Sequence, residues 1–202
     1  MPEVDFDRLL FTELREHVFG LGLISLRYNV FEYAFKFIIS NYAEYAVTNL
    51  VFDRATNEQR ANALRELAKA KETNPIVLDH IDYLLTFFAT CAENRNILMH
   101  SSQSWLRQPE KGSLTLEKRL KTGGRNIYQL DLEDIKRVAN DMIDGTNYLM
   151  QVDKLISEPK PLGLLGMPQT SPQKPPLPSK LNPHQPAVNL QTDPSQPEAS
   201  QV

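Results

Sequence analysis

The chain has 202 residues, a net charge of −3 and 14 prolines, and 11 of these prolines lie between Pro159 and Pro197. Proline inside a helix costs about 3 kcal/mol, so residues 1–158 can hold long helices whereas residues 159–202 cannot. The excess of acidic residues argues against blanket nucleic-acid binding, so any polyanion site must be a local patch. The single cysteine, Cys91, excludes an intrachain disulfide and a paired-cysteine metal site. We expect one domain over 1–158, in the cytoplasm and without membrane contact.

Residues 6–52 carry Leu, Phe, Ile and Tyr at spacings of three and four residues, which predicts helix rather than strand. Gly20 and Gly22 interrupt this pattern. Each glycine weakens an isolated helix by about 1 kcal/mol relative to alanine. The two glycines therefore either allow two helices to approach closely or mark a bend.

The next two helices have clear starting signals. Thr56 and Gln59 have the spacing of a capping box, which predicts a helix that continues to about Lys71. Asn74 followed by Pro75 supplies an N-cap and a first-turn proline. We expect the helix that begins there to run unbroken to about residue 100.

Residues 101–126 hold few helix formers in register, and apolar and polar residues alternate within 113–121, so we expect a short hairpin or an irregular excursion ending at Gly123 and Gly124. A final helix is predicted from Asp131, flanked by a hydrophobic staple, to about residue 156. The predicted fold is all-α: an up-and-down bundle of four to five helices with a short insertion.

The segment 159–202 combines Pro, Gln, Ser and Asn with single apolar residues. It lacks the apolar area that would offset its ordering entropy, so we expect a disordered tail. Pro175, Pro178 and Lys180 form a Pro-x-x-Pro-x-basic pattern that could dock in an aromatic groove. A plain spacer is the simpler interpretation, and a helical scaffold that recruits proline-recognition domains is a further alternative.

One polar stretch, residues 93–101, stands at the end of the helix that begins at Pro75. Asn96 and His100 project about 40° apart on a helix, and Glu93 lies one turn earlier on the same face. Arg95 ends an apolar stripe, where burial of its charge requires a partner. The simplest interpretation is that Arg95 and His100 interact, as cationic groups, with the last carbonyls of the helix.

Arg95-Asn96-x-x-x-His100 resembles the Arg-x(4 to 6)-His motif of the HEPN superfamily of small helical domains, including its place near the end of a long helix. Residues 21–32 are similar to an early helix of that family with an aromatic-Asn/Ser-x-x-Glu pattern, which would place Glu32 near the motif. The resemblance covers about residues 6–156. The excursion over 101–126 and the tail have no counterpart in the family's minimal core.

The resemblance implies a metal-independent endoribonuclease that needs no cofactor and cleaves RNA as a homodimer with a composite cleft. It assigns His100 as general acid/base, because histidine is the side chain whose ordinary pKa lets it take and give a proton near neutral pH. It assigns Arg95 as phosphate clamp, because its guanidinium is permanently charged. Asn96 would orient them, Glu32 would hold Arg95 or His100, and Glu93 would support the same face. A toxin or phage-defence role would bring an antitoxin or regulatory protein as partner. The alternative is a non-catalytic module that binds a nucleotide or a protein.

The excursion is locally basic. Between Trp105 and Arg125, six basic residues stand against Glu110 and Glu117, a net of +4. We expect phosphate contacts there, with Trp105 or Tyr128 available for base stacking, and a solvated basic loop is the alternative. The six candidate RNA-binding residues are Arg107, Lys111, Lys118, Arg119, Lys121 and Arg125.

Other ionisable residues point to structure rather than chemistry. Asp79-His80-x-Asp82 lacks the same-face spacing of a helical metal site, so no metal is expected there. His17 lies within a stripe of leucines and is expected to be packed. Cys91 lies on the apolar stripe and is expected to be buried and inert.

Overall fold

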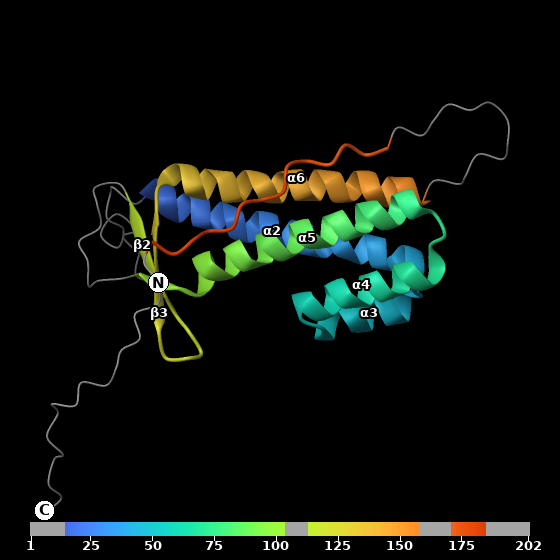
Figure 1. Cartoon of the computed structure of the whole chain (residues 1–202), viewed down its shortest axis with the longest axis horizontal. Coiled ribbons are helices and arrows are strands. Elements are labelled where there is room, and N and C mark those ends of the chain that lie inside the picture. The colour runs from blue at the N-terminus through green and yellow to red at the C-terminus, as the bar shows by residue number, and fades with distance from the viewer. Residues whose placement is uncertain (1–14, 104–112, 158–170, 185–202) are drawn as a thin grey trace, which may run out of the picture.

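The structure is a computed structural model that describes residues 15–103, 113–157 and 171–184. These residues form a helical bundle with a small antiparallel sheet (Figure 1), which confirms the predicted fold class. The elements in chain order are α2 (Arg15–Tyr42), α3 (Tyr45–Arg54), α4 (Asn57–Lys71), α5 (Pro75–His100), β1 (Ser102–Gln103), β2 (Leu114–Arg119), β3 (Arg125–Leu130) and α6 (Leu132–Ser157).

Three long helices make the body, and they alternate in direction. α2 and α6 run the same way, since the Asn41 side chain near the end of α2 donates to Asp153 Oδ1 near the end of α6, at 2.7 Å. α5 runs opposite to them, because His80 in its second turn contacts Tyr148 near the end of α6. α4 packs against both α2 and α5, and α3 lies beside it (Figure 1).

The starting signals of α4 and α5 act as predicted. The Thr56 amide donates to Gln59 Oε1 at 2.8 Å and the Gln59 amide donates to Thr56 Oγ1 at 3.3 Å, which completes the capping box. Asn74 Oδ1 accepts from the Ile76 amide at 3.0 Å. The predicted bounds of both helices are confirmed, and α5 runs unbroken from Pro75 to His100.

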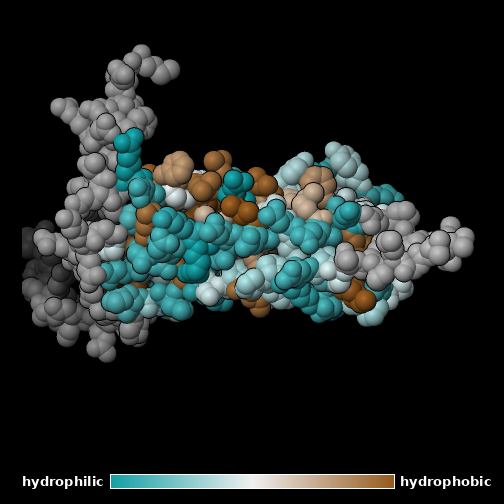
Figure 2. All heavy atoms as spheres, turned by 90° about the horizontal axis from the view of Figure 1, so that it is seen from above, coloured by the Kyte–Doolittle hydropathy of each residue, from teal (hydrophilic) through white to brown (hydrophobic). Residues whose placement is uncertain are grey.

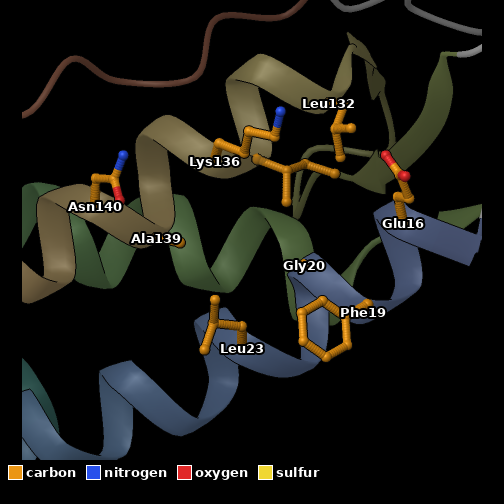
Figure 3. Close-up of a pocket in the computed structure, with 9 residues that line it drawn as sticks. Glu16, Phe19, Gly20, Leu23, Leu132, Lys136, Ala139 and Asn140 are labelled. Atoms are coloured by element: carbon orange, nitrogen blue, oxygen red, sulfur yellow. The ribbon is translucent and has the colours of Figure 1, made fainter.

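α2 continues through Gly20 and Gly22, and the chain leaves the helix only after Tyr42. Gly20 serves close approach: a Cβ atom there would lie 2.5 Å from Cγ2 of Ile135 on α6. Beside this crossing, a groove of about 550 Å³ separates the first turns of α2 and α6 (Figure 3). Its walls include Phe19 and Leu23, so it is mainly apolar.

The centre of the body is aromatic. Phe31 and Phe35 of α2 meet Phe88 of α5 at ring-centroid distances of 5.3 and 4.1 Å. Gly145 of α6 leaves the space that the rings of Phe31 and Phe87 fill, because a Cβ atom there would lie within 2.9 Å of both rings. The tight three-helix contact thus depends on large side chains facing a glycine.

α5 is long and apolar enough to cross a membrane by length and composition alone, and half of its most apolar window is buried inside the bundle. The core helix of a bundle has the same composition. Its buried residues, among them Ile81, Leu84 and Leu85, face the neighbouring helices.

The connection from α5 to α6 contains the predicted hairpin. β2 and β3 pair antiparallel from Leu114 opposite Leu130 to Arg119 opposite Arg125, and β1 adds a short third strand. Gly123 takes a φ of 88° in the turn, a conformation that favours glycine. The sheet therefore lies at the end of the bundle where α5 ends and α6 begins.

The tail differs from the expectation in its described part. Residues 171–184, here called the strap, have no helix or strand, yet they follow a fixed course along α5 and α6 (Figure 1). Pro178 is buried and Leu181 is 6% exposed. The strap has no regular secondary structure, as expected for the tail, but side chains of the body bind its backbone. Residues 158–170 and 185–202, the rest of the predicted tail, lie outside the described part.

Candidate functional site

The last two turns of α5 bring together the motif residues Arg95, Asn96 and His100. A terminal nitrogen of Arg95 donates to Asn96 Oδ1 at 3.2 Å and lies 3.0 Å from Nε2 of His100. Since the guanidinium can only donate, Nε2 accepts and the ring proton is assigned to Nδ1. The motif therefore forms one hydrogen-bonded cluster on a single helix.

Arg95 is half-buried, and its charge lies against an aromatic ring. The guanidinium carbon is 5.5 Å from the ring centroid of Tyr28, which belongs to α2 and is 2% exposed. Arg95 Nε is buried without a hydrogen-bond partner among the described residues. The arginine thus has Nε in the core and one terminal nitrogen at the histidine.

The Tyr28 hydroxyl connects this cluster to a second polar group. Asn57 Nδ2 donates to it at 2.5 Å. Burial raises the pKa of Tyr28, the Glu32 carboxylate raises it further, and the Arg95 guanidinium opposes them. Tyr28 consequently stays a neutral phenol at physiological pH.

Glu32 does not hold Arg95 or His100 as predicted. Its carboxylate forms an ion pair of 2.6 Å with Arg60 of α4, which also donates to the Phe52 carbonyl and stacks on the Phe52 ring at 4.5 Å. The Arg60 side chain is 13% exposed. Arg60, which also donates to Asn57 Oδ1 at 3.2 Å, thus holds the Glu32 carboxylate on the α4 side, and the effect of Glu32 near the motif is to raise the pKa of Tyr28.

Glu93 also has a different partner from the one expected. Its carboxylate pairs with Lys180 of the strap at 2.6 Å, and both side chains are exposed. Between Glu93 and Arg95, the fully buried Asn94 binds the strap backbone. The strap therefore covers Asn94, while Glu93 pairs with the strap at the edge of a groove that also reaches Asn96.

A groove of about 390 Å³ lies between α4 and α5 and reaches Asn96. Small side chains, such as Ala61, Ala89 and Ala92, contribute to its lining. Arg65 and Lys118 bring two positive charges to it, Glu58 and Glu93 bring two negative ones, and Asn57 and Asn62 bring amides. We call this the α4–α5 groove, and it is the described cavity that touches the motif.

The predicted RNA-binding residues fall into separate places. Lys118 lines the α4–α5 groove, whereas Arg119 and Lys121 are exposed on the hairpin and Arg125 pairs with Glu117 at 2.8 Å. Tyr128 is 4% exposed, so its ring is not available for base stacking as predicted. Arg107, Lys111 and Trp105 lie outside the described residues.

Comparison with known proteins supplies no family. No family model matches the chain, and neither a curated protein nor a solved structure is significantly similar to it.

Three residues at or near the site lie outside the predicted set. Tyr28 is the aromatic residue of the aromatic-Asn-x-x-Glu pattern, but only the packing of α2 against α5 shows that its ring lies against Arg95. Arg60 has no signal in the sequence, and the packing of α4 against α2 brings it to Glu32. Asn94 lies inside the conspicuous polar stretch, but its face of the helix points away from the motif. An asparagine within an apolar stripe is the one signal that could have marked it.

α2 carries an exposed apolar stripe. Figure 2 shows hydrophobic side chains gathered along one edge of the body. The stripe consists of five side chains that are 45 to 74% exposed: Phe19, Leu26, Val30, Tyr33 and Phe37. Their spacings of seven, four, three and four residues are typical of a helix face in contact with another helix.

The remaining ionisable candidates are structural. His17 and His80 are both 3% exposed, and Cys91 is 1% exposed with its pKa raised by burial. Over residues 15–103, 113–157 and 171–184, no group of three His, Cys, Asp or Glu side chains is placed to hold a metal ion.

Proposed function

We propose that the chain is a metal-independent endoribonuclease of the HEPN type that cleaves RNA through attack of its own 2′-hydroxyl. The observation that carries this proposal is the 3.0 Å contact between the Arg95 guanidinium and His100 Nε2 at the end of α5. A permanently charged fork beside an imidazole is the pair that such a reaction requires.

In this reaction the 2′-oxygen forms a bond to the adjacent phosphorus while the bond from phosphorus to the 5′-oxygen breaks. The products carry a 2′,3′-cyclic phosphate and a 5′-hydroxyl. His100 Nε2 accepts the 2′-hydroxyl proton once Arg95 turns from the imidazole to the phosphate, where its charge stabilises the transition state. Asn96 holds the guanidinium on the motif side through its 3.2 Å hydrogen bond.

The leaving 5′-oxygen needs a proton as well, and a second copy of the chain would supply a second imidazole. The exposed stripe on α2 offers a surface for such a homodimer. The α4–α5 groove offers Arg65 and Lys118 as phosphate contacts beside Asn96, with Glu58 and Glu93 balancing their charge. By its resemblance to HEPN domains, the enzyme would act as a toxin or in phage defence.

The proposal is tested by incubating the purified chain with single-stranded RNA in the presence of a chelator. We expect cleavage with 2′,3′-cyclic phosphate ends, and a loss of about 100-fold or more in rate for His100→Ala and for Arg95→Ala. His184→Ala and Arg27→Ala change exposed residues of the same types and should retain the wild-type rate.

Circular dichroism should show that the four variants keep the helical fold. Full activity of the Arg95→Ala, His100→Ala double variant would refute the assignment. RNA or nucleotide binding without turnover by the wild-type chain would instead select the non-catalytic module.

A further inference from the structure

The strap is held by side chains that bind its backbone. Asn94 of α5, which is 0% exposed, donates from Nδ2 to the Ser179 carbonyl at 3.0 Å and accepts the Leu181 amide at Oδ1 at 2.9 Å. Arg137 of α6 donates to the same Ser179 carbonyl at 3.0 Å. One amide side chain thus satisfies both a donor and an acceptor of an extended chain.

Further hydrogen bonds join the strap to the body on both sides of the Asn94 contacts. The Tyr83 hydroxyl donates to the Pro175 carbonyl, and His80 Nε2 lies 2.7 Å from Ser171 Oγ. At the far end, the His184 amide donates to the Ile127 carbonyl of β3 at 2.7 Å. These bonds follow α5 from its second turn to the sheet.

Two lysines of the strap form ion pairs with acidic residues of α5. Lys174 pairs with Asp79 at 2.6 Å and lies 4.9 Å from the ring centroid of Tyr83, while Lys180 pairs with Glu93 at 2.6 Å. Such exposed ion pairs contribute little stability, but they set direction and register.

Proline-rich chains suit this mode of binding, because an extended polyproline helix has no internal hydrogen bonds and presents its carbonyls to a receptor. Its conformation is largely preformed, so less entropy is lost on docking. Two strap side chains, Pro178 and Leu181, enter the body, whereas Leu177 is 48% exposed.

We propose that the face formed by α5 and α6 is a peptide-binding groove, and that the strap is its resident ligand. The groove, here called the strap groove, selects an extended proline-rich segment with an apolar side chain at the Leu181 position and lysines at the 174 and 180 positions. It recognises this ligand without needing the covalent connection through residues 158–170. The inference is independent of the proposed nuclease activity.

The test uses the full chain with a protease site placed within residues 158–170. After cleavage, the C-terminal fragment should stay with the body in gel filtration at micromolar concentration. A labelled synthetic peptide of residues 171–184 should then exchange with the fragment, measured by fluorescence anisotropy.

Matched peptides give the specificity. Leu181→Ala should compete roughly 30-fold more weakly than the wild-type peptide, as expected for a lost buried leucine, whereas Leu177→Ala should compete within about twofold. A peptide with the same residues in reversed order should not compete. Since only the peptides vary, the fold of the body is the same in every measurement.

Release of the fragment on cleavage would overturn the proposal, because the strap would then need its covalent link. Equal competition by the reversed or Leu181→Ala peptide would overturn it too, since the groove would have no specificity.

Discussion

At the scale of residues, Arg95 occupies a position where the apolar stripe of α5 would take a leucine. The ring of Tyr28, at 5.5 Å, and the imidazole of His100, at 3.0 Å, replace the apolar neighbours of a leucine. A cation held this way can leave the imidazole for a phosphate without breaking an ion pair among the described residues. That freedom distinguishes Arg95 from Arg60, which Glu32 fixes at 2.6 Å.

Substitution of two helical glycines by alanine should change the free energy of unfolding in opposite directions. Gly145→Ala places a Cβ atom within 2.9 Å of the Phe31 and Phe87 rings, so we expect destabilisation by about 1–3 kcal/mol. Gly22→Ala meets no atom within 4 Å and should stabilise the helix by about 0.5–1 kcal/mol. Urea unfolding measures both, and a destabilised Gly22→Ala would contradict the description of α2.

The motif could be predicted at this scale because its residues lie within six positions on one helix, where spacing alone determines proximity. The partners of Glu32 and Glu93 could not. Arg60 and Lys180 are brought to them by the packing of α4 and of the strap, and nothing local in the sequence marks that choice. The burial of Tyr128 depends in the same way on which face of the hairpin the body covers.

At the scale of elements, α2 combines a buried face with an exposed apolar one. Its stripe continues over about five helical turns, more than scattered surface residues require. A second copy of α2 would cover it and bring two motif helices into one assembly, as the proposed reaction needs.

We therefore expect the wild-type chain to be a dimer and the double variant Leu26→Glu, Val30→Glu to be a monomer, because two charges cannot be buried unpaired in such an interface. Light scattering coupled to gel filtration gives the mass. Ile76→Glu and Met150→Glu alter exposed apolar residues elsewhere and should leave the dimer intact. A wild-type monomer at high micromolar concentration would contradict this assignment.

Element boundaries could be predicted where a cap marks them. Asn74, Thr56 and Asp131 each precede a helix that begins as expected. The break between α2 and α3 has no such signal. Neither of the two glycines in the first half of α2 ends the helix: Gly20 is a contact point with α6, and Gly22 lies on open surface.

At the scale of the whole molecule, His80 joins three parts of the chain. Its ring nitrogens lie 2.6 Å from the Tyr148 hydroxyl on α6 and 2.7 Å from Ser171 Oγ on the strap. Burial lowers the pKa of His80 below its ordinary value of 6.5, the nearby Lys174 lowers it further, and Asp79 raises it.

The folded chain thus binds this proton less readily than the unfolded chain. The contribution to stability is complete above about pH 6.5 and is lost as the pH falls toward the lower folded pKa. Between pH 7.5 and 5.5, the free energy of unfolding should fall more for wild type than for His80→Gln, by less than about 1.4 kcal/mol per pH unit. Parallel pH profiles from urea titrations would rule out this role.

The strap marks the limit of prediction for the whole molecule. Its composition indicates disorder, and its own apolar residues could not form a core. It is ordered because Asn94, Tyr83 and Arg137 supply hydrogen bonds from outside the segment, up to 92 positions away in the chain. The order of the strap therefore depends on the side chains of α5 and α6 that bind it, and the composition of the strap alone cannot predict it.

The strap also imposes an order on assembly. Its contacts with α5 close loops of 85 to 95 residues in the unfolded chain. Once α5 and α6 have packed together, the free loop that the strap has to close is shorter, so the entropic cost of attaching it is lower. During synthesis these residues leave the ribosome after every element that they bind. A nascent bundle therefore passes through a stage in which Asn94 and the site of Leu181 face water, and attachment of the strap is the step that closes this surface.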